Sequence, residues 1–221
     1  MQGNTVSTQV EAKILATNKL IRNTYMLLAM TLVFSAVTAT LSVFLRLPPM
    51  TYLLSLGGAI VLMWFVLPRT ANSTSGIGVV FGITGLLGLG LGPLLSMYLS
   101  LPNGPQIVAT ALGGTGVIFF ALSGYALTTR RNFSFMGGFL ATGFLVVLAA
   151  SLVNIFLGIP AFSLAISATV VMLMSGFLLY ETSQMVHGGQ DNYVLATVGL
   201  YMTIFNLFVS LLHLLGFASN D

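Results

Sequence analysis

The stretch GIGVVFGITGLLGLGLGPLLSMYL, residues 76–99, contains no charged side chain. As an α-helix it would be about 36 Å long, because each residue adds about 1.5 Å, and the hydrocarbon core of a bilayer is about 30 Å thick. We therefore predict that this stretch crosses a membrane as a helix.

Similar apolar runs recur along the whole chain, separated by proline, glycine and charged residues. Of the 221 residues, 57% are hydrophobic and only 5% are charged, whereas about 25% of the residues in a soluble domain are charged. A surface of this composition could not face water. The predicted spans are residues 24–44, 51–67, 76–99, 106–127, 135–158, 161–181 and 194–216. The sequence thus predicts an all-α fold, a polytopic integral membrane protein built as a bundle of seven transmembrane helices.

The segments outside the predicted spans are too short for a soluble domain. Residues 1–22 are mostly polar and lack the apolar centre and cleavage site of a signal peptide, so we expect them to form a retained, flexible tail. Residues 23–217 are expected to form the transmembrane domain, and residues 218–221 a short end on the far side. The chain contains no cysteine, which excludes disulfides and thiolate chemistry.

Basic side chains are distributed unevenly between the two sides of the predicted bundle. With the N-terminal tail in the cytoplasm, every Lys and Arg except Arg46 falls on the cytoplasmic side. Cytoplasmic loops of membrane proteins are enriched in these residues. We therefore predict a cytoplasmic N-terminus and a C-terminus on the opposite side. The net charge of +3 is small, and nucleic-acid binding is not indicated.

Small residues predict where the helices approach one another closely, because helix association in lipid depends on close packing. The span at 76–99 carries glycine at spacings of three and four residues, and we expect this span to occupy the centre of the bundle. Its glycines are Gly78, Gly82, Gly85, Gly88 and Gly92. Shorter patterns of the same kind occur at Ala109, Gly113 and Gly116, and at Gly137 and Ala141.

Polar side chains follow one face of the last predicted span. They recur at spacings of three, four and three residues, which places them along one side of a helix that is expected to avoid lipid. This polar stripe consists of Thr203, Asn206, Ser210 and His213. Hydrogen bonding between helices is the preferred explanation, and an ion pathway is the alternative. His213 is expected to be a hydrogen-bonded core histidine rather than a metal ligand, because its helix offers no second ligand within reach.

Glu181 is a carboxylate at the edge of an apolar segment. It stands at the predicted end of the span 161–181, about 30 Å along the helix, where it would lie at the inner edge of the hydrocarbon. There it would also face the negative end of the helix dipole, so it needs a proton, a basic partner or a cation. The basic candidates on the same side are Arg22, Arg69, Arg130 and Arg131.

A structural ion pair with one of these arginines and a pH or cation sensor are two open interpretations of Glu181. A sensor would be stronger with a second carboxylate facing the first, and Asp191 is the nearby candidate. We expect no enzymatic activity, because the Ser-Gly pairs at Ser123 and Ser175 lack the signature of a hydrolase nucleophile.

Several motifs occur in a characteristic order along the chain. They are GLGLGPLL (88–95), ALGGTGVIFFALSGYALTTRRNFSFMGG (111–138), LVNIFLG (152–158) and LLYETSQMVHGGQDNY (178–193). Together they resemble the Bax inhibitor-1 family, also called the transmembrane Bax inhibitor motif family, over most of residues 20–217. The segments RNTY, ALGGT, LTTR, HGG and LGFAS are most similar to the bacterial YccA branch of that family.

The resemblance to this branch implies a bacterial inner-membrane protein with its C-terminus in the periplasm. It also implies a modulator of the FtsH protease, acting with the FtsH partners HflK and HflC on the degradation of membrane proteins. The lipid bilayer and FtsH are therefore the expected partners, and no oligomeric state is predicted.

Other members of the family act as pH-sensitive calcium leak channels, which use a pair of acidic residues on spans six and seven. By resemblance, Glu181 fills the first of these positions, whereas Thr203 stands at the second. One carboxylate and a hydroxyl make a poorer site for calcium than two carboxylates. The resemblance therefore implies no cofactor other than weakly held calcium at Glu181, and leaves a cation or proton leak as the alternative function.

Overall fold

The computed structural model describes residues 2–218, and all regular elements within that range are helices. The α-helices are α1 (Gln2–Phe44), α2 (Met50–Val61), α3 (Leu67–Thr70), α4 (Ser75–Leu99), α5 (Gly104–Thr129), α6 (Gly137–Leu157), α7 (Pro160–His187) and α8 (Tyr193–Ala218). A π-helical turn, Leu62–Val66, joins α2 to α3, and a 3-10 turn, Ser134–Met136, precedes α6.

Seven helical segments within the described part of the chain are long and apolar enough to cross a membrane. They are Ile14–Phe44, Met50–Thr70, Ser75–Leu99, Gly104–Thr129, Ser134–Leu157, Pro160–His187 and Tyr193–Ala218. The second of these is composite, since α2, the π-helical turn and α3 follow one another without a break. The predicted all-α fold with seven transmembrane helices is confirmed.

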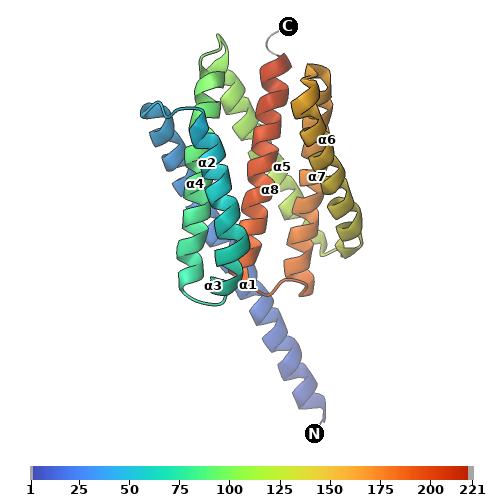
Figure 1. Cartoon of the computed structure of the whole chain (residues 1–221). Helices are drawn as coiled ribbons and strands as arrows, with labels where there is room; N and C mark the ends of the chain where they lie inside the picture. The colour runs from blue at the N-terminus through green and yellow to red at the C-terminus, as the bar shows by residue number, and fades with distance from the viewer. Residues whose placement is uncertain (1, 219–221) are drawn as a thin grey trace.

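The N-terminal segment differs from the predicted tail. Residues 1–22 were expected to be a separate, flexible segment, but α1 runs without interruption from Gln2 to Phe44 and includes the candidate membrane span Ile14–Phe44. The physical reason is that residues 2–44 contain no proline, so nothing forces the helix to end before the membrane. The first turns of α1 extend beyond the ends of the other helices (Figure 1). At the other end α8 continues to Ala218, and the remaining predicted end, residues 219–221, lies outside the described residues.

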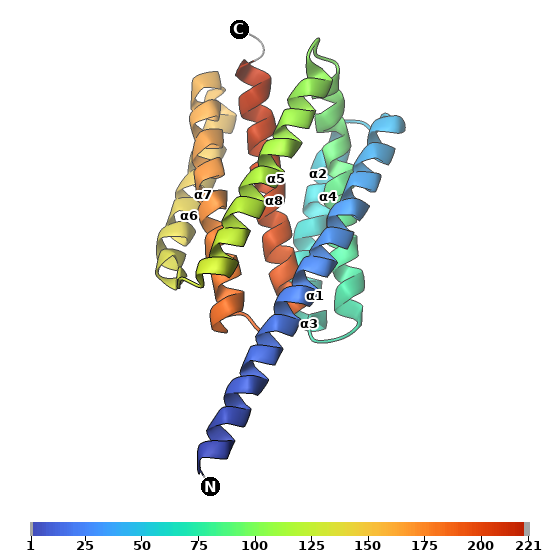
Figure 2. The same cartoon turned by 180° about the vertical axis from the view of Figure 1, so that it is seen from behind.

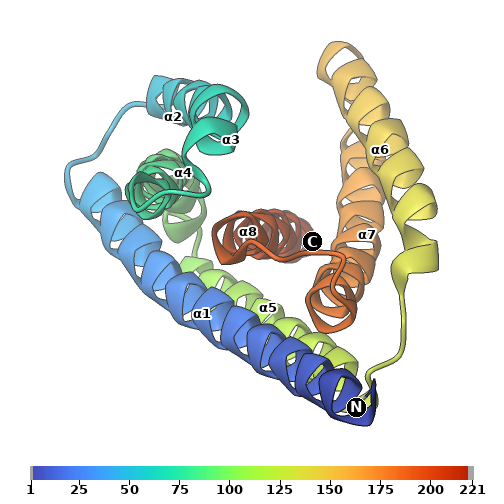
Figure 3. The ribbon, with the colours of Figure 1, turned by 90° about the horizontal axis from the view of Figure 1, so that it is seen from below.

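Helix α8 occupies the centre of the bundle. It contacts α1, α4, α5 and α7, and Figure 3 shows it between α4 and α7, with α1 and α5 along a third side, when the bundle is seen along its length. Helix α4 instead packs mainly against α1 and α2, and α6 packs against α7 on the other side. The prediction that the span at 76–99 is central is therefore wrong. Its glycines allow a close approach to α1 and α2, whereas α8 buries side chains such as Leu200, Leu207 and Leu212 along its whole length.

The glycines of α4 allow α1 to pack directly against the α4 backbone. A methyl group added to Gly88 would overlap the Ser35 carbonyl oxygen, and one added to Gly92 would overlap the Ser42 side chain. The Ser42 hydroxyl donates a hydrogen bond of 2.7 Å to the carbonyl oxygen of Leu89. The predicted close approach is thus present here, but it is absent at Gly113 and Gly116 of α5 and at Gly78 of α4, where an added methyl group would meet nothing within 4 Å among the described residues.

Candidate functional site

Glu181 lies on α7 about two turns before the helix ends, and not at its C-terminus as predicted. The helix continues through the polar residues that follow Glu181 and ends at His187, where Gly188 adopts a left-handed conformation with φ of 79°. Glycine enters this conformation without the steric cost that other residues pay, so Gly188 and not the first polar residue ends the helix. The expected interaction of Glu181 with the negative end of the helix dipole therefore does not arise.

The carboxylate of Glu181 is directed at the backbone of α8. Its Oε2 accepts a hydrogen bond of 3.1 Å from the Thr203 hydroxyl. A methyl group added to Gly199, one turn earlier on α8, would lie 2.8 Å from Oε1. Thr203 is 4% exposed, whereas Glu181 is partly exposed. The structure thus brings together the two residues that the family resemblance aligned with an acidic pair.

A cavity of about 250 Å³ gives access to Glu181 from the connection between α7 and α8. Gln184 and Gln190 supply further polar groups to its wall, and Gly199 forms part of its floor. Asp191 does not line this cavity. It faces a different cavity, together with the α3–α4 connection at residues 72–74. The predicted second carboxylate therefore does not face Glu181.

The arginines proposed as partners of Glu181 are engaged elsewhere or exposed. Among the residues that the structure describes, no ion pair joins Glu181 to Arg22, Arg69, Arg130 or Arg131, and its hydrogen bond comes from Thr203. The Arg69 guanidinium donates to the carbonyl oxygen of Phe65, one turn earlier on the same helix. The ion-pair interpretation of Glu181 thus has no support in the geometry.

The polar stripe of α8 is not one continuous network. Thr203 and Ser210 are buried, but the Asn206 side chain donates to the Met202 carbonyl oxygen of its own helix at 2.7 Å. His213 is exposed, and its Nδ1 lies 3.4 Å from the Ser167 hydroxyl. The predicted hydrogen bond is present, but the predicted core position is wrong: the adjacent Leu212 is fully buried, whereas His213 lies on the exposed face of the same helix.

Sequence reasoning missed the two residues that follow Glu181. Thr182 and Ser183 are fully buried. The Thr182 hydroxyl lies 3.4 Å from both the Tyr25 hydroxyl of α1 and the Ser123 hydroxyl of α5. The Ser183 hydroxyl accepts a hydrogen bond of 2.9 Å from the backbone N–H of Phe133, in the α5–α6 connection. The sequence feature that could have identified them is the run of residues 182–187, which continues the apolar helix without a proline or glycine that would end it.

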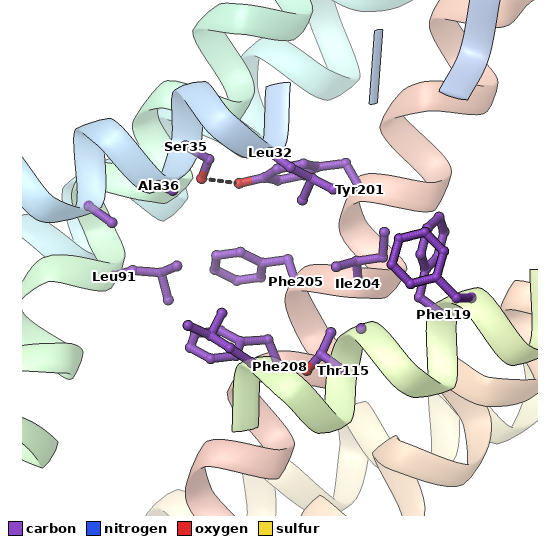
Figure 4. A pocket seen from close by; sticks show the side chains of 14 residues that line it. Leu32, Ser35, Ala36, Leu91, Thr115, Phe119, Tyr201, Ile204, Phe205 and Phe208 are labelled. Atoms are coloured by element: carbon purple, nitrogen blue, oxygen red, sulfur yellow. Dashed lines mark hydrogen bonds between the residues drawn. The ribbon is translucent and has the colours of Figure 1, made fainter. Parts of the chain in front are cut away.

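An apolar cavity of about 330 Å³ lies nearer the middle of the bundle, between α1, α4, α5 and α8. Figure 4 shows the rings of Phe119, Phe205 and Phe208 around it, and the hydrogen bond between the Ser35 and Tyr201 hydroxyls on one side. The two hydroxyl oxygens are 2.5 Å apart. The described lining residues include no charged side chain, so this cavity offers a cation no ligand of opposite charge.

A metal ion would find few ligands in this protein. Within residues 2–218 the structure gathers no group of three or more His, Asp or Glu side chains that could hold one. Calcium prefers six to eight oxygen ligands, and Glu181 with Thr203 supplies one carboxylate and one hydroxyl. The arrangement suits a proton or a weakly held cation better than a stable calcium centre.

Comparisons with known proteins agree with these features. The profile of the family described as "Inhibitor of apoptosis-promoting Bax1" matches residues 17–220. "Modulator of FtsH protease YccA" of Escherichia coli strain K12 is 50% identical over 215 residues, which cover 97% of both chains. "Inner membrane protein YccA" of Escherichia coli O6:H1 has the same identity and coverage. An "Uncharacterized membrane protein" of Vibrio cholerae is 45% identical over 207 residues, or 94% of this chain and 93% of the relative. With the family profile covering nearly all of its seven-helix bundle, the chain belongs to the Bax inhibitor-1 family of membrane proteins.

Proposed function

We propose that this chain is a non-enzymatic protein of the bacterial inner membrane that binds and modulates an FtsH-type membrane protease. The observation that carries the proposal is the 50% identity, over 97% of both chains, to a protein named as a modulator of that protease. A relative of equal similarity is named as an inner-membrane protein. HflK and HflC, expected from the family resemblance, are the further partners of this proposal.

The orientation belongs to the same proposal. Arg22, Arg69, Arg130 and Arg131 lie near the end of the bundle from which α1 projects, and Arg46 lies near the opposite end. The positive-inside rule then places the N-terminus in the cytoplasm and the C-terminus in the periplasm. The catalytic domain of a protease that degrades cytoplasmic segments would meet the projecting part of α1.

The projecting part of α1 supports a direct interaction. Residues 2–13 precede the apolar part of the helix and would reach about 18 Å from it. An accessible chain end is a site where a membrane-anchored unfoldase could take hold. A deletion of residues 1–22 would remove part of the membrane span, so the better test is a deletion of residues 2–13 that leaves Ile14–Phe44 intact.

The experiment compares the full chain with the variant lacking residues 2–13, in cells with and without FtsH. We expect the full chain to copurify with FtsH and to slow the degradation of a second membrane substrate, and the shortened chain to lose both effects. Removal of residues 219–221, at the other end of the chain, is the matched control. If the variant lacking residues 2–13 copurifies with FtsH as well as the control variant does, and gives the substrate the same half-life, the projecting helix has no role in the interaction.

A second candidate function is a pH-sensitive leak of protons or cations, calcium included, past Glu181. The observation that favours it is a single carboxylate held between α7 and α8, bonded to Thr203 and open to a cavity. Purified wild type, Glu181→Gln and Thr203→Asp would be compared for proton and calcium flux in liposomes at neutral and acidic pH. Wild-type flux that disappears in Glu181→Gln would favour the leak. Flux that appears only in Thr203→Asp would mean that this chain retains the scaffold without the conductance.

A further inference from the structure

A further cleft is formed by residues of α1, α5 and α7. Figure 2 shows the ends of α5 and α7 beside the part of α1 that leaves the bundle. Its volume is about 400 Å³. It is lined by Ile14, Thr17, Asn18 and Ile21 of α1, Leu127 and Arg130 at the end of α5, and Val186 of α7. None of these residues takes part in the site at Glu181.

The cleft lies at the level where the membrane-spanning segments end. The part of α1 beside the cleft carries Lys19 and Arg22, α5 ends at Thr129 and α7 ends at His187. The cleft is lined by four aliphatic side chains, Ile14, Ile21, Leu127 and Val186, together with Thr17, Asn18 and Arg130. The headgroup region of a bilayer adjoins the hydrocarbon at this depth. A lining that combines aliphatic side chains with a cationic one therefore suits a phospholipid, which joins acyl chains to a charged headgroup.

Both backbone polar groups of Arg130, its N–H and its carbonyl oxygen, are hydrogen-bonded. Its φ of 49° lies in the left-handed region, which is uncommon for a residue other than glycine. The Arg130 N–H donates to the Ala126 carbonyl oxygen at 3.1 Å, and the Arg130 carbonyl oxygen accepts from His187 Nε2 at 3.0 Å. Within the described part of the chain, no hydrogen bond or ion pair engages the guanidinium. A rigid backbone thus holds a free guanidinium at the wall of the cleft.

The charge around the cleft favours an anion. Lys19, Arg22 and Arg131 lie at the same end of the bundle, and the described residues that line the cleft include no carboxylate. Arginine binds phosphate through two parallel hydrogen bonds, and its charge assists both. The amide of Asn18 and the hydroxyl of Thr17 add donors from α1.

We propose that this cleft binds the phosphate group of an anionic membrane phospholipid. Arg130 holds the phosphate, Asn18 and Thr17 complete the polar lining, and Ile21, Leu127 and Val186 pack against the adjoining glycerol and first acyl carbons. A soluble phosphate compound shares the anionic chemistry but lacks the apolar part. The site is independent of the modulation of a protease and of any leak at Glu181.

The test titrates the purified full chain in detergent with phosphatidylglycerol, and in parallel with phosphatidylcholine, and counts bound lipid by native mass spectrometry. We expect one phosphatidylglycerol to bind more tightly than phosphatidylcholine. Arg130→Gln should weaken the binding of phosphatidylglycerol about tenfold or more, because a hydrogen bond to a charged group contributes at least one decade of affinity. Arg131→Gln is the matched control, since Arg131 carries the same charge next in the chain and does not line the cleft.

Two results would overturn the proposal. Equal losses in Arg130→Gln and Arg131→Gln would mean that only the net charge of this end attracts the lipid. Displacement of phosphatidylglycerol by inorganic phosphate at similar concentrations would mean that the aliphatic side chains contribute nothing. Should Arg130→Gln fail to fold, Asn18→Leu tests the same site, because Asn18 is exposed on the surface of α1. It should weaken the binding of phosphatidylglycerol, and unchanged binding of that lipid would count against the site.

Discussion

Replacing Gly92 by alanine tests how closely α1 and α4 are packed. The added methyl group would overlap the Ser42 side chain and would lie 3.0 Å from the Ser42 carbonyl carbon. Carbon atoms in contact are normally about 3.5–4.0 Å apart. Because one of the neighbours is backbone, rotation of the serine side chain does not relieve the overlap. The two helices must therefore move apart at this point.

The cost of Gly92→Ala follows from three contributions. Overpacking of a tight contact costs about 1–3 kcal/mol. The hydrogen bond from Ser42 to the Leu89 carbonyl oxygen would be lost, at about 0.6 kcal/mol for such a bond in a membrane. Alanine gains up to about 1 kcal/mol over glycine inside a helix. With the full gain of alanine subtracted, we expect Gly92→Ala to lower the free energy of unfolding by about 0.6–2.6 kcal/mol.

The assay is reversible unfolding of the purified protein in lipid bicelles, with Gly78→Ala as the matched control on the same helix. Gly78 has nothing within 4 Å of an added methyl group, so this control should leave stability unchanged or raise it slightly. Ser42→Gly should partly restore the stability of Gly92→Ala, because it removes the side chain that the methyl group overlaps. Equal stability of Gly92→Ala and Gly78→Ala would falsify the close packing.

Two further substitutions examine particular contacts. Tyr201→Phe removes the hydroxyl that bonds Ser35 and also donates to the Thr84 carbonyl oxygen at 3.4 Å, and should cost about 0.6 kcal/mol for each bond in the same unfolding assay. An unchanged stability would mean that neither bond contributes. Gly199→Ala places a methyl group 2.8 Å from Glu181 Oε1 and should move the carboxylate away from Thr203. Thr203→Val should then destabilise the wild type but not Gly199→Ala, and equal effects in both backgrounds would contradict the geometry.

The membrane spans could be predicted from the sequence because hydropathy and helix length are local properties of a segment. The ends of the helices were harder to predict. Polar residues after Glu181 suggested that α7 ends there, but the helix continues with Thr182 and Ser183 buried in the bundle until Gly188 favours a left-handed turn. The same reason explains α1, which continues from Gln2 into the membrane because no residue before Ile14 breaks it.

The packing partners could not be predicted from spacing alone. Gly92 and Gly113 stand in similar glycine patterns, yet only Gly92 has a neighbouring helix at its Cα. The spacing of glycines predicts which face of a helix lacks bulky side chains. Which other helix packs against that face depends on the arrangement of the whole bundle. The family resemblance predicted the contact between Glu181 and Thr203. These two positions align with a pair of residues that face each other in other members of the family, and a single sequence does not show which residues face each other.

One turn of α7 links the candidate site to the rest of the bundle. Three consecutive residues, Glu181, Thr182 and Ser183, contact three different places: Thr203 of α8, the hydroxyls of α1 and α5, and the α5–α6 connection. A substitution that removes the Glu181 side chain would therefore disturb a junction of the fold as well as a carboxylate. Glu181→Gln keeps an oxygen that can accept the hydrogen bond from Thr203 and removes only the charge. A loss of function in Glu181→Gln with unchanged stability would thus be attributable to the charge, whereas a loss in Glu181→Ala would not.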